Sequence, residues 1–373
     1  MRAGIPTSEV RSRAAGGRLT IDLAALRANW RSLAKRSGSA TAGAVVKADA
    51  YGLGIEPAVR ALAQEGCDTF FVALVEEGLR ARSVAPDAAI YVLNGLYPGT
   101  APLHAAGNLR PILGSMAEVE EWAAVTVRGK PQAAIHVDTG MNRLGLTLGQ
   151  ARILAGRTDL HRAIRPSLVM SHLACSDDPD NRMNPEQLER FREVGSLFPG
   201  VAASLANSGG ILMGRDYHFD LTRPGIALYG GRASIDMPPL SPVVMLQARV
   251  IVVREADAGD TIGYGATETL KRRSRIAVLS AGYADGFHRA ASSSDSRPGA
   301  RVHIRGRFAP LVGRVSMDLM TADVTSVPGV QRGDWAELFG PHIPVDEAAA
   351  HAGTNGYEFL TGLGRRYERV YKS

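Results

Sequence analysis

The chain has 373 residues, of which 45% are hydrophobic, and a formal net charge of +6. This length is more than one ordinary hydrophobic core accommodates, so two domains are expected. No apolar run is long enough to span a membrane. The Lys and Arg residues are scattered and aromatic residues are few, which disfavours a nucleic-acid-binding surface.

The first 20 residues include four arginines but no apolar segment like that of a secretory signal. We therefore expect residues 1–17 to form a flexible extension. Cys67 and Cys175 make neither a CxxC pair nor a disulfide framework. Two isolated cysteines are typical of a reducing compartment, so a cytoplasmic location is predicted.

From residue 20 to residue 230, short β-rich runs alternate with helical patterns such as 57–65 and 185–197. This alternation predicts parallel βαβ units, and eight of them make a (β/α)8 TIM barrel, which we assign to residues 18–240. A doubly wound open sheet is the alternative, but no G-x-G-x-x-G opens a first helix. The expected strands are 43–49, 68–74, 90–95, 110–114, 133–138, 167–173, 202–207 and 219–225.

The proline-rich residues 237–242 mark a domain boundary. Beyond them, β-rich runs are separated by glycine turns, which predicts a mainly antiparallel β domain over residues 241–373. Its clearest expected strands are 243–255, 275–279, 301–304 and 335–339.

Polar side chains lie at the expected C-terminal ends of five barrel strands, where TIM barrels place their chemistry. They are Lys47, Asp138, His172, Asn207 and Arg223. Taken alone, Asp138 suits an N-cap for the next turn, His172 a hydrogen-bonded core histidine and Arg223 a surface ion pair. Their common position at one end of the barrel favours a shared site.

Lys47 ends an apolar run within AVVKADAYGLG, residues 44–54. An amine at the end of a buried strand is desolvated, which lowers its pKa and lets it attack a carbonyl group to form a Schiff base. The alternative is a lysine that points into water. The loops 208–210 and 224–226, after strands 7 and 8, contain glycines and a serine that suit phosphate binding. Together these features predict pyridoxal 5'-phosphate (PLP) as the cofactor, and no metal site is expected.

Further motifs follow the lysine segment in order along the chain. They are VDTGMNRLG (137–145), SHLACSD (171–177), ANSGG (206–210), TRPGIALYG (222–230), GYG (263–265), AGYADG (281–286), VGRVSMD (312–318) and GYEFLTGLG (356–364). With these motifs the chain resembles bacterial PLP-dependent alanine racemases over residues 18–373.

The resemblance implies a role for each matched residue. Lys47 would bind PLP covalently and act as one catalytic base, while Tyr264, from the other subunit of a homodimer, would be the second. The implied cofactor-binding residues are Lys47, Tyr51, Arg143, His172, Asn207, Ser208, Arg223, Gly225, Ile226 and Tyr357. Arg223 would face the pyridine nitrogen and Arg143 the phenolic oxygen of the ring. Substrate would be bound by Arg143, Met317 and Tyr283, with Asp177 and Arg289 lining the entrance.

Two positions depart from the family pattern. Many members carry a carbamylated lysine at the position of His136, and its negative charge stabilises the arginine that Arg143 matches. Histidine forms no stable carbamate, so Arg143 needs another acceptor. Ser316 stands where cysteine is common.

The resemblance implies an alanine racemase that interconverts L-alanine and D-alanine by a two-base mechanism and supplies D-alanine for peptidoglycan. The alternatives are a broader-specificity PLP racemase, a decarboxylase of the same barrel class and, in a different class, a non-enzymatic PLP-binding regulatory protein. Such regulatory proteins consist of the barrel alone, and such decarboxylases place an acidic residue against the pyridine nitrogen. The second domain and Arg223 therefore favour the racemase.

Overall fold

The computed structural model describes residues 14–237 and 240–373, which form two compact units. One unit, the barrel, comprises Ala24–Ser241, and the other, the β unit, combines the residues up to Leu23 with Pro242–Ser373. Most of the extension expected over residues 1–17 lies outside the described residues.

The described part of the barrel contains eight parallel strands, of which the first consists of two short segments, β2 and β3, on either side of Gly43. The segments are β2 (Thr41–Ala42), β3 (Ala44–Val45), β4 (Thr69–Val72), β5 (Ala89–Val92), β6 (Arg110–Leu113), β7 (Ala133–His136), β8 (Pro166–Met170), β9 (Ala202–Ser204) and β10 (Leu221–Thr222).

The eight strands close into a ring. Strands β3 to β9 lie side by side in chain order, and β10 pairs with β2. Next to β10, Asp220 N donates to Ala203 O of β9 at 3.0 Å. Next to β2, Gly43 N donates to Thr222 O of β10 at 2.9 Å, so β10 bridges β9 and the first strand. The closed parallel sheet confirms the predicted TIM barrel.

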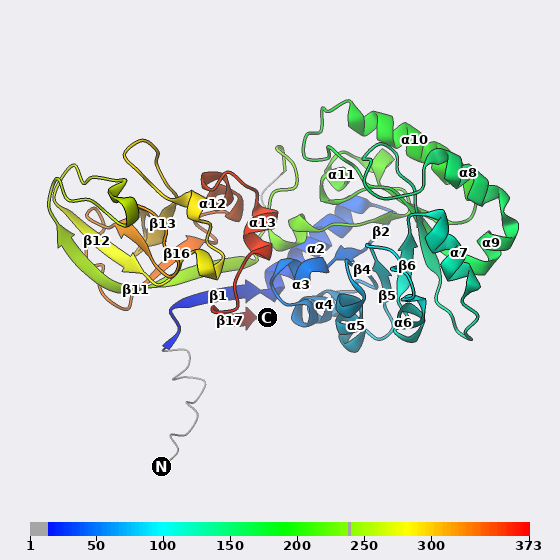
Figure 1. Ribbon diagram of the computed structural model, residues 1–373, viewed down its shortest axis with the longest axis horizontal. Helices are drawn as coiled ribbons and strands as arrows, with labels where there is room; N and C mark the ends of the chain where they lie inside the picture. The colour runs from blue at the N-terminus through cyan, green and yellow to red at the C-terminus, as the bar shows by residue number, and fades with distance from the viewer. Residues whose placement is uncertain (1–13, 238–239) are drawn as a thin grey trace, which may run out of the picture. The chain divides into compact units, whose positions relative to one another are not determined.

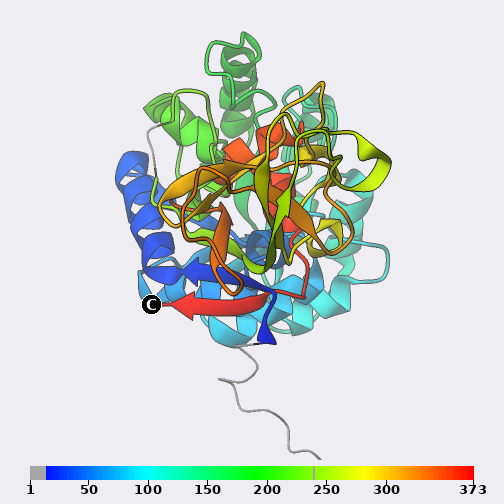
Figure 2. The same cartoon turned by 90° about the vertical axis from the view of Figure 1, so that its left-hand side faces the viewer.

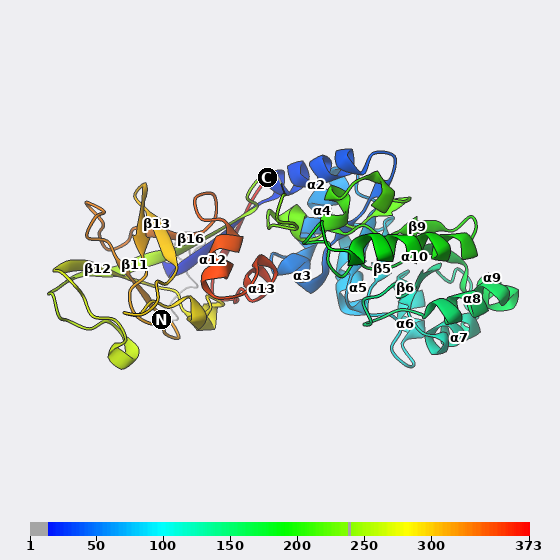
Figure 3. The same cartoon turned by 90° about the horizontal axis from the view of Figure 1, so that it is seen from above.

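Helices connect most of the strands, and α7 to α10 are seen on the outside of the ring in Figure 3. The barrel helices are α2 (Leu23–Ser37), α3 (Lys47–Tyr51), α4 (Ile55–Gln64), α5 (Val75–Val84), α6 (Ala101–Ala106), α7 (Met116–Ala124), α8 (Leu148–Gly156), α9 (Thr158–Ile164), α10 (Met183–Leu197) and α11 (Ser208–Leu212), with 3-10 turns η1 (Arg215–Tyr217) and η2 (Ile226–Tyr229).

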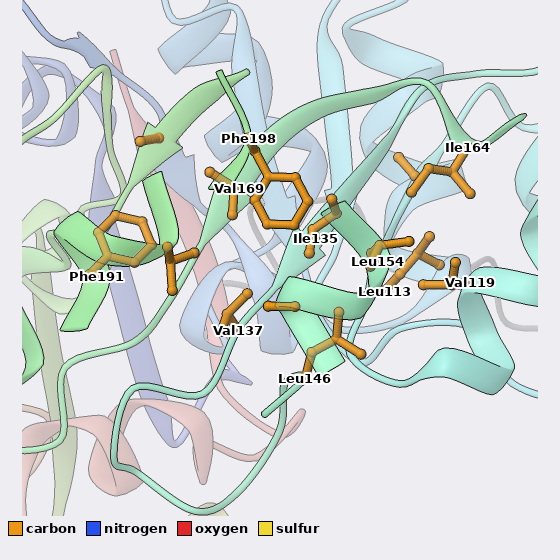
Figure 4. Close-up of a cluster of buried hydrophobic side chains, with 14 of the residues drawn as sticks. Leu113, Val119, Ile135, Val137, Leu146, Leu154, Ile164, Val169, Phe191 and Phe198 are labelled. Carbon is orange, nitrogen blue, oxygen red and sulfur yellow. The ribbon is translucent and has the colours of Figure 1, made fainter. Parts of the chain in front are cut away.

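Apolar side chains from strands and helices form the barrel core. Ile135 of β7 and Val169 of β8 belong to one buried cluster with Leu154 of α8 and Phe191 of α10 (Figure 4). Each such side chain contributes about 1.5–3 kcal/mol when it is fully buried. The strands are therefore held firmly, and their carboxyl ends can position polar side chains.

The β unit contains a mainly antiparallel sheet, as predicted. Its strands are β1 (Gly17–Asp22), β11 (Val244–Ala256), β12 (Ser274–Leu279), β13 (Arg301–Ile304), β14 (Arg307–Pro310), β15 (Met320–Asp323), β16 (Trp335–Phe339) and β17 (Glu368–Lys372). Its helical segments are α12 (Val345–His351), α13 (Gly356–Thr361), η3 (Tyr264–Ala266), η4 (Tyr283–Asp285) and η5 (Arg289–Ala291).

Strand β1 departs from the expected domain boundary, which assigned residues 18–240 to the barrel. It pairs antiparallel with β11, where Leu19 lies opposite Leu246, and parallel with β17, where Leu19 lies opposite Arg369. Figure 1 and Figure 2 show β1 beside these strands of the β unit. The sequence pattern did not reveal this because the partners of β1 lie more than two hundred residues along the chain.

Within residues 14–237 and 240–373, no helix combines the length and apolar character that crossing a membrane requires.

Candidate active site

Several of the candidate site residues lie at the carboxyl ends of the barrel strands, the barrel rim. Lys47 follows β3, His136 ends β7, His172 follows β8 and Arg223 follows β10. Burial lowers the pKa of His172 well below its usual value, and the charges of Arg223, Arg143, Lys47 and His136 lower it further. Because all four groups contribute to the lowered pKa of His172, they share one electrostatic environment.

The Lys47 amine has the property expected of a nucleophilic lysine. Burial lowers its pKa below the usual value, and the nearby charge of Arg143 acts in the same direction. The charge of Glu77 raises the pKa and opposes these effects in part. A larger fraction of the amine is therefore unprotonated near neutral pH than for a lysine in water.

A left-handed turn follows Lys47 directly. The φ angles are 53° at Ala48, 55° at Asp49, 55° at Ala50 and 55° at Tyr51. Residues other than glycine cost about 1–3 kcal/mol each in this region, and four in a row persist only where neighbouring contacts hold them. The turn places Lys47 and Tyr51 at its two ends.

Two carboxylates stabilise this turn. Glu77 Oε1 accepts from Asp49 N at 3.2 Å, and Asp49 Oδ1 accepts from Ile55 N at 3.0 Å and from Arg80 Nη2 at 2.7 Å. Arg80 in turn donates to both carboxylate oxygens of Glu56. Neither Glu77 nor Arg80 was predictable from the sequence, since neither belongs to a motif and both act through contacts distant in sequence.

Arg223 is buried, with 3% of its surface exposed. Its guanidinium donates to uncharged oxygens, namely Ser204 Oγ, Ser171 O at 2.6 Å and Leu205 O at 3.3 Å. Burial lowers its pKa to about 9, so the group remains a cation at neutral pH. The alternative reading of Arg223 as a surface ion-pair residue is wrong.

Ser208, Gly225 and Tyr51 converge near the start of α11. Asn207 caps this helix by accepting from Gly210 N at 2.9 Å. Ser208 Oγ accepts from Gly225 N at 2.8 Å. A Cβ at Gly225 would lie 2.4 Å from the Tyr51 hydroxyl oxygen, so a larger residue here would displace the Tyr51 side chain. The backbone and hydroxyl groups here form a polar cradle.

His136 and Arg143 line a cavity of about 320 Å³ together with Asn94, Ser115 and Glu118. Burial lowers the pKa of His136 to about 4, and the charge of Arg223 adds to this effect. The ring is therefore neutral at pH 7. Asp138, two residues further on, accepts from Gly140 N and Met141 N at 2.8 Å and thus caps the turn that follows β7, in agreement with the alternative reading of this residue.

Five further candidate residues, Tyr264, Tyr283, Arg289, Met317 and Tyr357, belong to the β unit. Tyr264 lies on η3 with 73% of its surface exposed and lines a cavity of about 380 Å³ with Arg314, Ser316 and Leu319. The segments of Tyr283 and Met317 are adjacent, because Tyr283 N donates to Ser316 O and Ala284 N to Met317 O, both at 3.0 Å. The side chains of Tyr283, Met317 and Tyr357 are exposed. Arg289, on η5, lines a separate polar cavity.

Comparison with known protein families gives matches over most of the chain. Residues 21–233 match the alanine racemase N-terminal domain, and residues 243–371 match the alanine racemase C-terminal domain.

Individual relatives agree. The chain is 51% identical to the biosynthetic alanine racemase of Agrobacterium fabrum, over 95% of this chain and 93% of that protein. It is 50% identical to an alanine racemase of Rhizobium meliloti, over 96% of this chain and 97% of that one. It is 44% identical to the catabolic alanine racemase of A. fabrum, over 96% of this chain and 92% of that one.

Among solved structures, alanine racemase from Bartonella henselae with covalently bound pyridoxal phosphate has a TM-score of 0.89 and 39% identity. The alignment covers 96% of this chain and 100% of that one. The biosynthetic alanine racemase from Pseudomonas aeruginosa has a TM-score of 0.90 and 35% identity, with the same coverage.

The left-handed turn predicts that an alanine-to-glycine substitution within it does not lower the free energy of unfolding. Ala48→Gly should leave the free energy of unfolding unchanged or raise it by up to about 1 kcal/mol, because glycine adopts positive φ without steric cost. Ala63→Gly, in the right-handed helix α4, should instead lower it by about 1 kcal/mol. Urea unfolding of both variants measures the difference. Equal losses in both variants would contradict a left-handed turn at Ala48.

The neutral His136 ring makes stability depend on pH. In the unfolded chain a histidine binds a proton near pH 6.5, whereas the pKa of His136 in the folded chain is about 4. The free energy of unfolding should therefore fall as the pH is lowered from about 6.5 to about 4. In His136→Asn the slope of the free energy of unfolding against pH should be smaller by up to ~1.4 kcal/mol per pH unit. Urea unfolding across this range tests the prediction, and an identical slope in the variant would refute it.

Proposed function

Because the chain belongs to the alanine racemase family, we propose that it interconverts L-alanine and D-alanine with PLP as its cofactor. The observation that carries the proposal is the pair of groups at the barrel rim. Lys47 supplies an amine whose pKa burial lowers, and Arg223 supplies a buried cation whose acceptors are neutral oxygens. This combination suits a cofactor that is bound covalently and whose ring nitrogen stays unprotonated.

The residues at the rim fit PLP. Lys47 would hold it covalently, and the cradle of Ser208, Gly225 and Tyr51 suits a phosphate because glycine leaves room for backbone approach. We propose that Ile226 and Tyr357 complete the phosphate site. Arg143, His172, Asn207 and Arg223 would surround the ring. When bound, PLP supplies an electron-accepting ring that stabilises the negative charge left on the α-carbon once its proton is removed.

Inversion of the α-carbon requires one base on each of its faces. We propose that the Lys47 amine accepts the α-proton of D-alanine and that the Tyr264 phenolate accepts that of L-alanine. The base on the opposite face then donates a proton, so the centre inverts with no net change in protons. The lowered pKa of Lys47 favours the free amine that this exchange needs. We propose that Arg143, Met317 and Tyr283 position the substrate.

Arg223 favours racemisation over competing reactions. A guanidinium facing the ring nitrogen disfavours a second positive charge there, which weakens the ring as an electron acceptor. A weaker acceptor limits decarboxylation and transamination. The decarboxylase alternative requires an acidic residue in this place, and the barrel-only regulatory protein lacks a β unit such as that of residues 242–373.

We propose that the enzyme supplies D-alanine for peptidoglycan. The biosynthetic relative of A. fabrum, at 51% identity, is more similar to this chain than the catabolic relative of the same organism, at 44%. A cytoplasmic location fits this role, and Cys67 and Cys175 are both free thiols, as expected in a reducing compartment.

We further propose a homodimer whose two active sites each combine residues of both chains. Support comes from exposed apolar and aromatic side chains of the β unit, namely Tyr264, which is the proposed second base, Met317 and Leu319. Exposed side chains of this kind mark an interface when they cluster. A second copy would cover them and bring Tyr264 to the barrel rim of its partner.

Substitution of the lysine tests the proposed cofactor and activity together. The native chain should convert L-alanine to D-alanine in preference to other L-amino acids. Lys47→Ala should lose covalently bound PLP and lower the racemisation rate at least about 10²-fold, since a positioned base contributes about 10²–10⁴-fold. Borohydride reduction followed by mass analysis measures bound PLP, and a chiral assay measures racemisation.

Lys35→Ala, at an exposed position on α2, is the matched control and should behave like the native chain. If Lys47→Ala still traps PLP at native occupancy, another lysine binds the cofactor and the assignment is wrong.

Complementation tests the shared site. Lys47→Ala and Tyr264→Ala should each be nearly inactive. A mixed dimer has one site with both substitutions and one with neither. Equal amounts reassociated at random give about half mixed dimers, so activity should return to roughly a quarter of the native value. Subunit exchange under mild denaturant, followed by the racemisation assay, measures the recovery. No recovery despite demonstrated exchange would mean that both bases come from one chain.

A further inference from the structure

His303, Glu337 and His342 form a cluster in the β unit that the proposed racemase activity does not use. Strands β13 and β16 are paired so that His303 lies directly opposite Glu337. Side chains at opposite positions of neighbouring strands point to the same face of a sheet. The sheet register therefore brings an imidazole and a carboxylate together from segments more than thirty residues apart.

The turn after β16 brings the third residue to the same place. Gly340 N donates to Ile343 O at 2.7 Å, which reverses the chain. His342 then returns to Glu337, with its backbone N at 2.8 Å from Oε1 and its Nδ1 at 2.8 Å from Oε2. Gly340 has a φ of 158°, and a Cβ there would lie 3.1 Å from the Glu337 carboxylate. Glycine thus allows the turn to fold closely over the carboxylate.

The two imidazole rings are in contact. Their centroids are 3.7 Å apart with an angle of 17° between the planes. Phe308 lies 5.2 Å from the His303 ring. Glu337 is 4% exposed, whereas the His342 side chain is 53% exposed. The cluster therefore combines a buried carboxylate with an imidazole that solvent reaches.

The ligand atoms of the three residues all lie within 4.8 Å of one another. Among the residues that the structure describes, this is the one group of three or more His, Cys, Asp or Glu side chains with this property. Zinc binds imidazole nitrogen and carboxylate oxygen at about 2.0–2.2 Å, so two ligands of one ion are at most about 4.4 Å apart. Metal binding therefore requires the exposed His342 ring to rotate out of the stack, which would bring its nitrogen within this range.

From this arrangement we propose that His303, Glu337 and His342 bind one divalent transition-metal ion of the zinc type. Two imidazoles and one carboxylate are a donor set that Zn²⁺, Ni²⁺ and Cu²⁺ accept, whereas Mg²⁺ and Ca²⁺ prefer a shell of oxygen atoms. A permanent positive charge would also compensate a carboxylate that is buried in the sheet. Water can occupy the fourth position because His342 is exposed.

The ion would act as a clamp on the β unit. Its ligands come from β13, β16 and the turn 340–343, so one ion would link three segments that backbone hydrogen bonds otherwise hold. The sequence predicted no metal site, and His303, Glu337 and His342 show none of the spacings of known metal motifs. The strand register and the turn 340–343 bring them together.

Zinc titration tests the site. The full chain, free of affinity tags and loaded with PLP, is stripped of metal and titrated with Zn²⁺ against a chromophoric chelator. One tight site per chain is expected. His342→Gln and His303→Gln should each weaken it at least about tenfold. His351→Gln, which changes a histidine on α12 of the same unit, should leave it unchanged.

Two further measurements make the test specific. Co²⁺ in place of Zn²⁺ should give the intense visible absorption of a four-coordinate site, and hydrogen exchange in β13 and β16 should slow when zinc is added. Racemisation by His342→Gln without zinc should equal that of the native chain. Binding that survives the His303→Gln/His342→Gln double substitution, or no tight binding at all, would overturn the proposal without affecting the proposed function.

Discussion

The hydrogen bonds that close the barrel between its first and last strands determine the geometry of the candidate site. They pair β2 with β10 and continue past the strands, where Val45 N donates to Pro224 O at 2.9 Å. Lys47 lies just after β3, the second segment of the first strand, and Arg223 follows β10, so closure brings the amine and the buried guanidinium to neighbouring positions on the rim. An open sheet would leave its first and last strands apart, and the two groups would not share an electrostatic environment.

The rim collects positive charge and keeps its histidines neutral. Lys47, Arg143 and Arg223 all act on His172, and burial lowers the pKa of both His136 and His172. Concentrating cations in a desolvated place costs free energy unless an anion offsets it. The resulting field attracts ligands that carry phosphate or carboxylate groups. Binding of an anionic cofactor would therefore relieve repulsion between these basic groups as well as form new contacts.

Features set by local pattern were predictable from the sequence, whereas features set by distant contacts were not. The eight barrel strands follow from short β-rich runs, and Lys47 follows from its place at the end of one of them. Strand β1 has the same local pattern but pairs with β11 and β17, a choice that no local signal encodes. The left-handed turn depends on Glu77, and the cluster at Glu337 depends on sheet register. The roles assigned to the site residues remain predictions.

The pairing of the first strand with the last has a consequence for how the chain is made on the ribosome. The barrel is continuous in sequence, so its residues can complete their hydrogen bonds as soon as Ser241 has emerged. Strand β1 is synthesised before all of them. Glu368, which accepts a hydrogen bond from Arg18 of β1, lies 350 residues further along the chain. Leu19 and Ile21, buried in the finished molecule, stay exposed during most of translation. The nascent chain thus carries an unpaired apolar strand, a segment of the kind that chaperones bind and that aggregates when left unprotected.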